Sequence, residues 1–343
     1  MTNSSIASAG PMFSLHPLHR RLLTEVRSRK LWAQGDSLLI GVSGGQDSLC
    51  LLKLLVDLCP EKQWRLHVLH LDHAWRETSA ADSEAVRQFC EALNVPCTVM
   101  RATIAPASEA AARKWRYEQF QEVAQSLDIP IVLTAHTASD RAETLLFNLT
   151  RGSALDGLGS LPWTRALGPN LQLIRPLLST TRQETQEFCR LHNLPVCLDQ
   201  TNEDLNYQRN RIRLELLPYL AKHFNPRVEQ SLSRTVEILA EERRYLEAQT
   251  QKIYEAVYEA PNRLHRLKLR EEALALQRRV ILKFLGDCLY SGRGGHPCFD
   301  DIEMVRQLLH APNQKRTRPL IQGISLSVQE DWVVILHGDS LRK

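Results

Sequence analysis

The stretch SLLIGVSGGQDSLCLLKLLVDL, residues 37–58, decides the fold. Its first part, residues 37–43, is an apolar run typical of a buried strand, and residues 48–58 are a leucine-rich segment typical of a helix. Glycines between them let the backbone turn tightly and approach a ligand, and the amides at a helix start attract an anion. The stretch therefore predicts a phosphate-binding loop at Ser43, Gly44, Gly45, Gln46, Asp47 and Ser48.

Asp47 is the acidic residue of this loop. A carboxylate beside phosphates is repulsive unless a cation lies between them, so Asp47 is expected to hold Mg²⁺. The GxxxxGK(S/T) loop and the GxGxxG pattern are both absent, which indicates a different kind of phosphate loop. The alternative is a plain strand-to-helix turn with a serine or aspartate cap, but one cap needs neither two glycines nor further hydroxyls.

Apolar runs alternate with helical segments from Ser37 to about residue 199. Further strands are predicted at 65–72, 96–102 and 129–136, and helices at 79–94, 108–127 and 139–150. A short apolar run at 171–178 and a helix near 181–193 close this part of the chain. The pattern predicts a doubly wound α/β fold with a mainly parallel sheet, in which ligands lie beyond the carboxyl ends of the strands.

The chain becomes helical and basic from Arg209 onward. Residues 209–320 carry 21 lysines and arginines against 14 aspartates and glutamates. Such an excess suits a polyanionic partner such as RNA, although solvated helix faces explain it as well. The sequence predicts a flexible tail at 1–14, a catalytic domain at 15–208, and a smaller, mainly helical domain at 209–343 that ends in a hairpin.

Bulk composition is that of an ordinary globular protein, with 43% hydrophobic and 24% charged residues. No stretch approaches the roughly 20 apolar residues of a membrane span, and the N-terminus lacks a secretory signal, so a cytoplasmic protein is expected. The eight cysteines contain no CxxC pair and are expected to be reduced thiols. The oligomeric state stays open, a homodimer included.

The loop resembles that of the N-type ATP pyrophosphatases, the PP-loop superfamily. Within it, five further blocks resemble the tRNA(Ile)-lysidine synthetase family: HLDHAWR (70–76), EAAARKWRYEQF (109–120), TAHTASDRAETLLFNLTRGS (134–153), RPLL (175–178) and DQTNEDLNYQRNRIRLELLPYL (199–220). The resemblance implies an adenine nucleotide alpha hydrolase-like fold. It also implies that ATP·Mg²⁺ adenylates the wobble cytidine of the CAU anticodon of tRNA(Ile) on its carbon 2 oxygen, that pyrophosphate leaves, and that L-lysine then displaces AMP.

Polar residues follow the second and fourth strands, at the ligand edge of the sheet. Asp72 and His73 are expected to bind tRNA or lysine, with an N-capping aspartate and a packed histidine as the alternative. His136 is expected to stabilise charge on the phosphates, and Asp140 to hold a second Mg²⁺ or to orient the attacking amine. Glu143 is a candidate for recognising the lysine ammonium, or it pairs with Arg141.

The block around Asp140 departs from the family pattern. The family reads roughly HHxDDQAET, whereas this chain reads HTASDRAET at 136–144, so the second histidine and the first aspartate are missing. The carboxylate role therefore falls on Asp140.

Two groups of basic residues complete the predicted site. Arg113 and Arg116 share a helix face with Tyr117, which is a solvated basic face or part of the site. The resemblance implies that this helix borders the active site, and Arg113 is then the candidate for contacting phosphate or the RNA base. The junction between the domains supplies candidates for binding tRNA or lysine: Asp199, Asn202, Arg209 and Arg213.

Three other functions remain open from the sequence. A tRNA thiolase would share the phosphate loop but is expected to carry paired cysteines. A small-molecule ligase of the superfamily would not need the basic helical domain. A catalytically inactive RNA-binding homologue is the third, because the block at 136–144 is altered.

Overall fold

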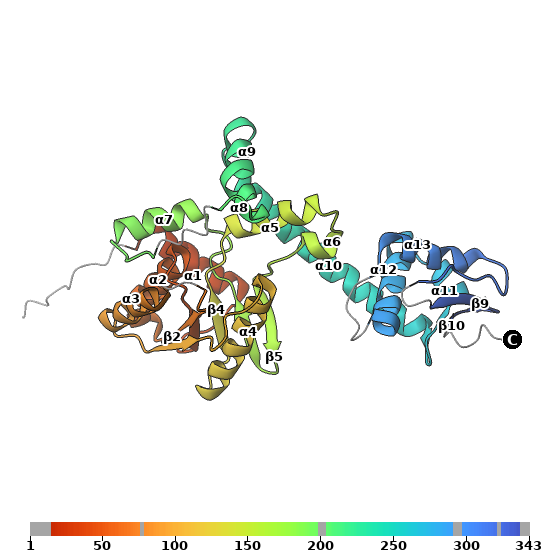
Figure 1. Ribbon diagram of the computed structural model, residues 1–343, viewed down its shortest axis with the longest axis horizontal. Coiled ribbons are helices and arrows are strands. Elements are labelled where there is room, and N and C mark those ends of the chain that lie inside the picture. The colour runs from red at the N-terminus through yellow and green to blue at the C-terminus, as the bar shows by residue number, and fades with distance from the viewer. Residues whose placement is uncertain (1–14, 76–78, 198–203, 291–296, 321–323, 337–343) are drawn as a thin grey trace, which may run out of the picture. The chain divides into compact units, whose positions relative to one another are not determined.

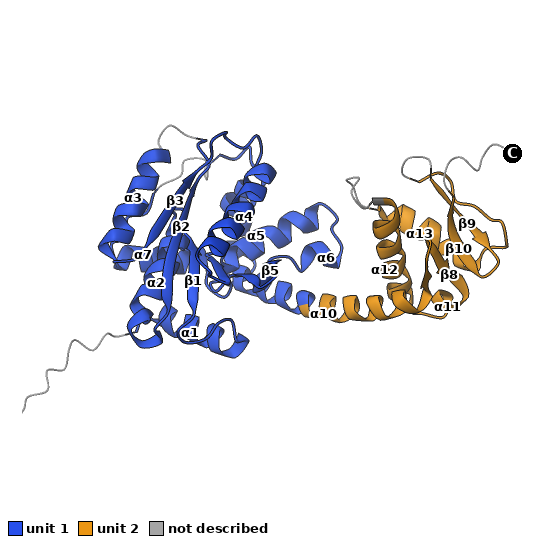
Figure 2. Ribbon diagram, turned by 90° about the horizontal axis from the view of Figure 1, so that it is seen from below, with its two compact units in different colours: residues 1–240 blue, residues 241–343 orange. Residues whose placement is uncertain are grey.

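The computed structural model describes residues 15–75, 79–197, 204–290, 297–320 and 324–336. It contains two compact units, residues 1–240 and 241–343 (Figure 2). The domain boundary expected between residues 208 and 209 rests on composition and stays a prediction. The expected tail at 1–14 lies outside the described residues.

The first unit is built on a six-stranded sheet with the order β3-β2-β1-β4-β6-β5 (Figure 1). All neighbouring strands are parallel except β5, which runs antiparallel to β6. The strands are β1 Ser37–Gly41, β2 Arg65–Asp72, β3 Cys97–Arg101, β4 Ile131–Thr134, β5 Thr164–Gly168 and β6 Leu171–Ile174. The predicted fold class is confirmed, and the first four strands lie within two residues of their expected ends.

Helices cover both faces of this sheet. On one face Leu38 and Ile40 of β1 pack in the same core as α1, α2 and α7, and on the other Leu39 packs with Phe120 of α4. A strand buried on both faces explains the unbroken apolar run in the sequence. The helices are α1 Pro17–Arg29, α2 Gln46–Lys62, α3 Ser79–Ala92, α4 Glu109–Ser126, α5 Ala138–Thr150, α6 Leu155–Leu158 and α7 Arg182–Leu191.

Strand β1 lies at the point where the winding of the sheet reverses. It pairs in parallel with β2 on one side and with β4 on the other. In doubly wound sheets ligands bind beyond the carboxyl ends of the strands at this point. The residues that follow β1 and β4 here are 42–48 and 135–140, so the predicted phosphate loop and the altered block meet at one edge.

A short helical projection, called the prong below, precedes the last helix of the first unit. It consists of α8 Gln208–Arg211, a π-helical turn Ile212–Leu216 and α9 Leu217–His223. Ile212 and Leu217 anchor its base in a small core with Ala142 of α5. Figure 1 shows α9 standing out from the sheet and its covering helices. The chain continues into α10, Val228–Val257, which runs into the second unit.

The second unit packs helices against a four-stranded antiparallel sheet with the order β7-β8-β10-β9. The expected C-terminal hairpin is present as β9 and β10, and β7 and β8 extend it. No helix among the described residues is long and apolar enough to cross a membrane. The elements are β7 Tyr258–Glu259, β8 Arg263–His265, α11 Arg266–Arg270, α12 Leu274–Leu285, a π-helical turn Gly286–Tyr290, α13 Phe299–Gln307, a 3-10 turn Leu308–His310, β9 Ser325–Gln329 and β10 Trp332–Leu336.

Candidate active site

The loop after β1 has the shape of an anion cradle. Gly45 is the N-cap of α2 and offers no side chain to the first turn of that helix, so the helix start is left for a ligand. Ser43 and Ser48 hold the turn together, because the Ser43 amide donates to Ser48 Oγ at 3.2 Å and Ser48 Oγ donates to the Gly45 carbonyl at 2.8 Å. The loop is therefore preorganised.

Gly44 occupies a position that only glycine fills without strain. Its φ is +84°, and a Cβ there would lie 3.2 Å from Cys197 Sγ and 3.3 Å from Val86 Cγ2. Its carbonyl also accepts a 3.0 Å hydrogen bond from the Cys197 amide. The segment around Cys197 thus supports the outer side of the loop.

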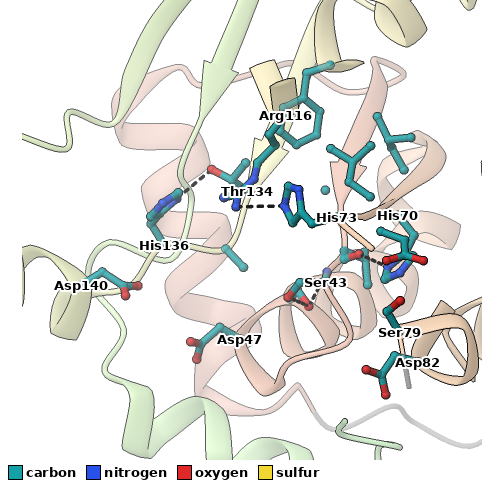
Figure 3. A pocket seen from close by; sticks show the side chains of 18 of the residues that line it. Ser43, Asp47, His70, His73, Ser79, Asp82, Arg116, Thr134, His136 and Asp140 are labelled. Atoms are coloured by element: carbon teal, nitrogen blue, oxygen red, sulfur yellow. Dashed lines mark hydrogen bonds between the residues drawn. The ribbon is translucent and has the colours of Figure 1, made fainter. Parts of the chain in front are cut away.

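A cavity of about 460 Å³ opens beside this loop, at the carboxyl ends of β1, β2 and β4 (Figure 3). Eight of the predicted site residues line it: Ser43, Asp47, Ser48, Asp72, His73, Arg116, His136 and Asp140. Others border the loop or the neighbouring helices without lining the cavity: Gly44, Gly45, Gln46, Arg113, Glu143, Arg209 and Arg213. Asp199 and Asn202 lie outside the described residues.

Asp47 and Asp140 converge on Arg182, the first residue of α7. Arg182 Nε lies 3.2 Å from Asp47 Oδ2, and its Nη2 lies 3.5 Å from Asp140 Oδ1. Burial raises the pKa of Asp47 against the opposing charge of Arg182. Burial would also raise the pKa of Asp140, but Arg182 and His136 outweigh it and lower that pKa. Two carboxylates and one guanidinium therefore share one wall of the cavity.

Asp140 also has a structural role at the start of α5. Its Oδ2 accepts hydrogen bonds from the amide of Thr137 at 2.7 Å and from Thr137 Oγ1 at 2.8 Å, which completes a capping box. Since Oδ2 is engaged in this way, Oδ1 is the oxygen that faces Arg182.

Gln46 points away from the cavity. Its Nε2 donates to the Arg182 carbonyl at 2.8 Å and to Thr185 Oγ1 at 3.1 Å. Thr185 Oγ1 in turn donates to Asp47 Oδ1. Gln46 thereby ties the phosphate loop to α7 and positions the helix that carries Arg182.

Glu143 is buried behind the cavity wall, with 3% of its surface exposed. Arg213 binds it with both Nε and Nη2, at 2.6 and 2.8 Å from Oε1 and Oε2, and Arg182 Nη1 lies 4.0 Å from Oε1. Burial raises the pKa of Glu143 despite these charges. The expected alternative partner, Arg141, is not used, because Arg141 Nε donates to the Leu161 carbonyl and its Nη1 lies 3.6 Å from a glutamate of α10.

Arg209 and Arg213 lie against the same helix, α5. Arg213 binds Glu143, and the Arg209 guanidinium lies 5.6 Å from the ring of Phe147, one turn further along. Arg209 Nη1 is also 3.3 Å from Glu109 Oε1, an exposed ion pair. Arg213 is therefore part of the buried charge network, whereas Arg209 stays near the surface.

The opposite side of the cavity carries His73 and Arg116 (Figure 3). Arg116 Nη2 lies 3.4 Å from His73 Nε2, and burial together with the charge of Arg116 lowers the pKa of His73 to about 4. Burial also lowers the pKa of His136, whose Nδ1 lies 3.0 Å from Thr134 Oγ1. Both imidazoles are therefore neutral near pH 7 and offer one donor and one acceptor each.

Asp72 and Arg113 border this side in different ways. Asp72 is buried, and its Oδ1 accepts a 2.7 Å hydrogen bond from the Ala74 amide, which stabilises the turn after β2. Arg113 is exposed, and its guanidinium lies 5.1 Å from the Tyr117 ring and adds to the positive potential around His136 and Arg116.

Arg182 and Thr185 were not predicted as site residues from the sequence. They begin a helix that was expected only as the end of the domain, and they lie about 140 residues from Asp47 along the chain. A signal was present, because this helix follows β6, which neighbours β4, and so starts at the same edge of the sheet. Phe120 was also missed, although it lines the cavity and a Cβ on Gly41 would come within 2.6 Å of its ring.

The chain is similar in sequence to known proteins over most of its length. A family described as a PP-loop domain matches residues 16–220. A tRNA(Ile)-lysidine synthase of Gloeobacter violaceus is 49% identical over 304 residues, which cover 89% of this chain and 92% of that protein. The synthase of the same name from Thermosynechococcus vestitus is 46% identical over 327 residues, 95% of this chain and 93% of that protein. Among solved structures, a tRNA thiolase of Methanococcus maripaludis has a TM-score of 0.55 and 16% identity over 65% of this chain and 78% of that chain, which shows a shared fold.

Proposed function

The chain belongs to the tRNA(Ile)-lysidine synthase family of PP-loop enzymes, and we propose that its residues carry out the ligation as follows. The wobble cytidine of tRNA(Ile) attacks the α-phosphorus of ATP through its carbon 2 oxygen, and pyrophosphate leaves. An amine of L-lysine then attacks carbon 2, and the oxygen departs with AMP. No nucleophilic side chain is needed, because adenylation turns a poor leaving group into a good one.

The observation that supports this best is the arrangement at the β1 and β4 ends. An open helix start, which follows a glycine held at a φ of +84°, borders a cavity whose wall carries Asp47, Asp140 and Arg182. Amides and a guanidinium stabilise negative charge that grows on a leaving pyrophosphate. Neutral His136 can donate one further hydrogen bond to a phosphate oxygen.

Mg²⁺ fits this donor set through Asp47 and Asp140. The described residues contain no group of three or more side chains that could hold a metal by themselves. Mg²⁺ in nucleotide sites is typically bound by one or two carboxylates together with phosphate oxygens, so a pair of aspartates is the expected protein share. When bound, the ion neutralises phosphate charge and polarises the α-phosphate.

Glu143 is the proposed partner of the lysine substrate. It is a buried carboxylate next to Asp140 whose present charge partners are Arg213 and Arg182. A cationic amino acid that reaches this wall would find acidic groups already desolvated, where charge pairs are stronger than in water. Arg213 would have to share or release Glu143 for that contact.

The tRNA is proposed to meet the basic side of the site and the basic C-terminal part of the chain. Arg113 and Arg116 lie on the cavity side that carries His73, and Arg209 is exposed on α8, at the base of the prong. Guanidinium groups in such positions bind phosphates and stack on unpaired bases. The roles of Asp72, Asp199 and Asn202, the cytoplasmic location and the homodimer stay predictions.

Incubation with a tRNA(Ile) transcript, ATP, Mg²⁺ and L-lysine tests the proposal. We expect stoichiometric pyrophosphate and AMP, and a nucleoside whose mass equals cytidine plus lysine minus water. Omitting lysine should stop the formation of that nucleoside. Pyrophosphate without the lysine adduct, or no turnover by a folded enzyme, would contradict the assignment.

A further inference from the structure

The tip of the prong exposes aromatic rings that the fold does not use. Tyr219 is 55% exposed and Phe224 is 73% exposed. The rings form a cluster, with the His223 centroid 4.6 Å and the Phe224 centroid 6.1 Å from that of Tyr219. Exposed apolar side chains that gather in one place mark interaction surfaces more often than single ones do.

The tip of the prong, residues 216–228, carries only positive charge, and the glutamates that flank it have partners elsewhere: Glu215 lies 3.5 Å from Arg211, and Glu229 accepts a hydrogen bond from Ser139 Oγ. Residues 216–228 contain Lys222 and Arg227 and neither aspartate nor glutamate. Neither of the two pairs with a carboxylate among the residues that the structure describes. Aromatic rings interleaved with unpaired cations are the composition that binds single-stranded nucleic acid, through stacking on bases and contacts to phosphates.

The base of the same prong enters the active-site wall. Arg213 lies in its π-helical turn and binds Glu143, which also lies 4.0 Å from Arg182. Leu217, the first residue of α9, is buried against α5 and its neighbours. The prong is thus anchored at the site that must receive the wobble base and ends in the aromatic cluster.

We propose that this tip, formed by Tyr219, His223 and Phe224 with Lys222 and Arg227, binds unpaired bases of the tRNA substrate next to the wobble position. The inference rests on the proposed function and names a surface for its RNA partner. Bases stack on Tyr219 and Phe224, while Lys222 and Arg227 contact the flanking phosphates. RNA is favoured over a protein partner because exposed rings lie beside two cations, Lys222 and Arg227, that pair with no carboxylate among the described residues.

Binding of a tRNA(Ile) transcript to the full chain provides the test. Phe224→Ala and Tyr219→Ala should each weaken binding about tenfold, the value of one lost base–aromatic stack. Phe224→Tyr should keep wild-type affinity, and Phe224→Leu should lose as much as the alanine variant. Tyr245→Ala is the matched control, since Tyr245 is 65% exposed on α10 but the cations before it are paired with carboxylates, Arg243 with Glu247 and Arg244 with Glu241.

Kinetics separate a binding surface from a merely structural one. Phe224→Ala should raise KM for tRNA about tenfold and leave kcat at saturating tRNA and KM for ATP unchanged. Lys222→Gln should reduce the slope of log affinity against log salt by about 0.7. Unchanged tRNA affinity in the alanine variants overturns the proposal. It is also overturned if the wild type is a dimer and the alanine variants are monomers that keep their tRNA affinity, because the tip would then be a dimer contact.

The lysine-adduct assay and the tRNA-binding assay together distinguish this failure from that of the proposed function. If the wild type forms no lysine adduct on tRNA, the proposed function fails. If the wild type forms it and the alanine variants bind tRNA like the wild type, only the role of the prong tip fails.

Discussion

Replacing Arg182 by alanine removes the cation on which the acidic wall of the cavity depends. Arg182 lies 3.2, 3.5 and 4.0 Å from carboxylate oxygens of Asp47, Asp140 and Glu143. At an effective dielectric constant of about 20, one such pair at about 4 Å attracts by about 4 kcal/mol. Desolvation of the partners cancels much of this attraction, so the raw sum is not the stability that Arg182 contributes.

The expected net loss in Arg182→Ala is about 2 kcal/mol in the free energy of unfolding. Loss of one partner of a fully buried pair costs about 3 to 5 kcal/mol, and the loss expected here is smaller than that because 31% of the Arg182 side chain is exposed. We expect a further loss of about 100-fold in pyrophosphate formation, the usual effect of removing one group that stabilises transition-state charge. Arg182→Lys should recover part of the stability, since a lysine keeps the charge but not the planar fork.

Urea denaturation and pyrophosphate release at saturating ATP measure the two effects separately. Arg190→Ala is the control, because Arg190 lies on the same helix and is exposed. It should change stability by less than about 0.5 kcal/mol and leave turnover intact. An Arg182→Ala variant with the stability and turnover of Arg190→Ala would refute the electrostatic reasoning.

Further predictions concern the loop, the carboxylates and the histidines. Gly44→Ala and Gly35→Ala should each lower the free energy of unfolding by about 1 kcal/mol, because both glycines have a positive φ. Only Gly44→Ala should raise KM for ATP, because Gly44 lies in the phosphate loop, whereas a Cβ on Gly35 meets nothing within 4 Å. Equal KM values for the two variants would contradict a phosphate-binding role of the loop. Asp47→Asn should stay folded and form no AMP, and retained turnover would remove its metal role. Since burial raises the pKa of Asp47 and Arg182 opposes this, Arg182→Ala should move the acid-side fall of pyrophosphate formation to higher pH, and an unmoved profile would count against that titration. The imidazole of His73 should stay neutral from pH 8 to 5 in an NMR titration because burial, with the charge of Arg116, lowers its pKa to about 4, and a midpoint near 6.5 would show that the imidazole is neither buried nor held beside Arg116.

Sequence reasoning reached the parts of the site that follow a buried strand. Residues 37–48 combine an apolar run, two glycines and a helix start. The apolar run predicts a buried strand, and the glycines before a helix start predict an anion-binding turn, so the same residues predicted both the loop and the fold. The strand at 65–72 was predicted to the residue because it is long and flanked by polar segments. Strand β5 was missed because it is exposed along most of its length and carries no apolar signal.

The sequence did not predict contacts between site residues that are distant along the chain. The contacts of Arg182 with Asp47 and of Arg213 with Glu143 join residues that only the packing of α7 and the prong against α5 brings together. The direction of Gln46, toward α7 and away from the cavity, depends on the same packing. Residue type and strand order predict which edge of the sheet a group reaches, and neighbouring helices decide which way it faces.

A crystal structure of the full chain with Mg²⁺ and a non-hydrolysable ATP analogue tests the central claim most directly. We expect the phosphates against the main-chain amides of residues 44–48, with the metal between them and the carboxylates of Asp47 and Asp140. Nucleotide bound elsewhere, or phosphates that leave these amides unoccupied, would contradict the claim.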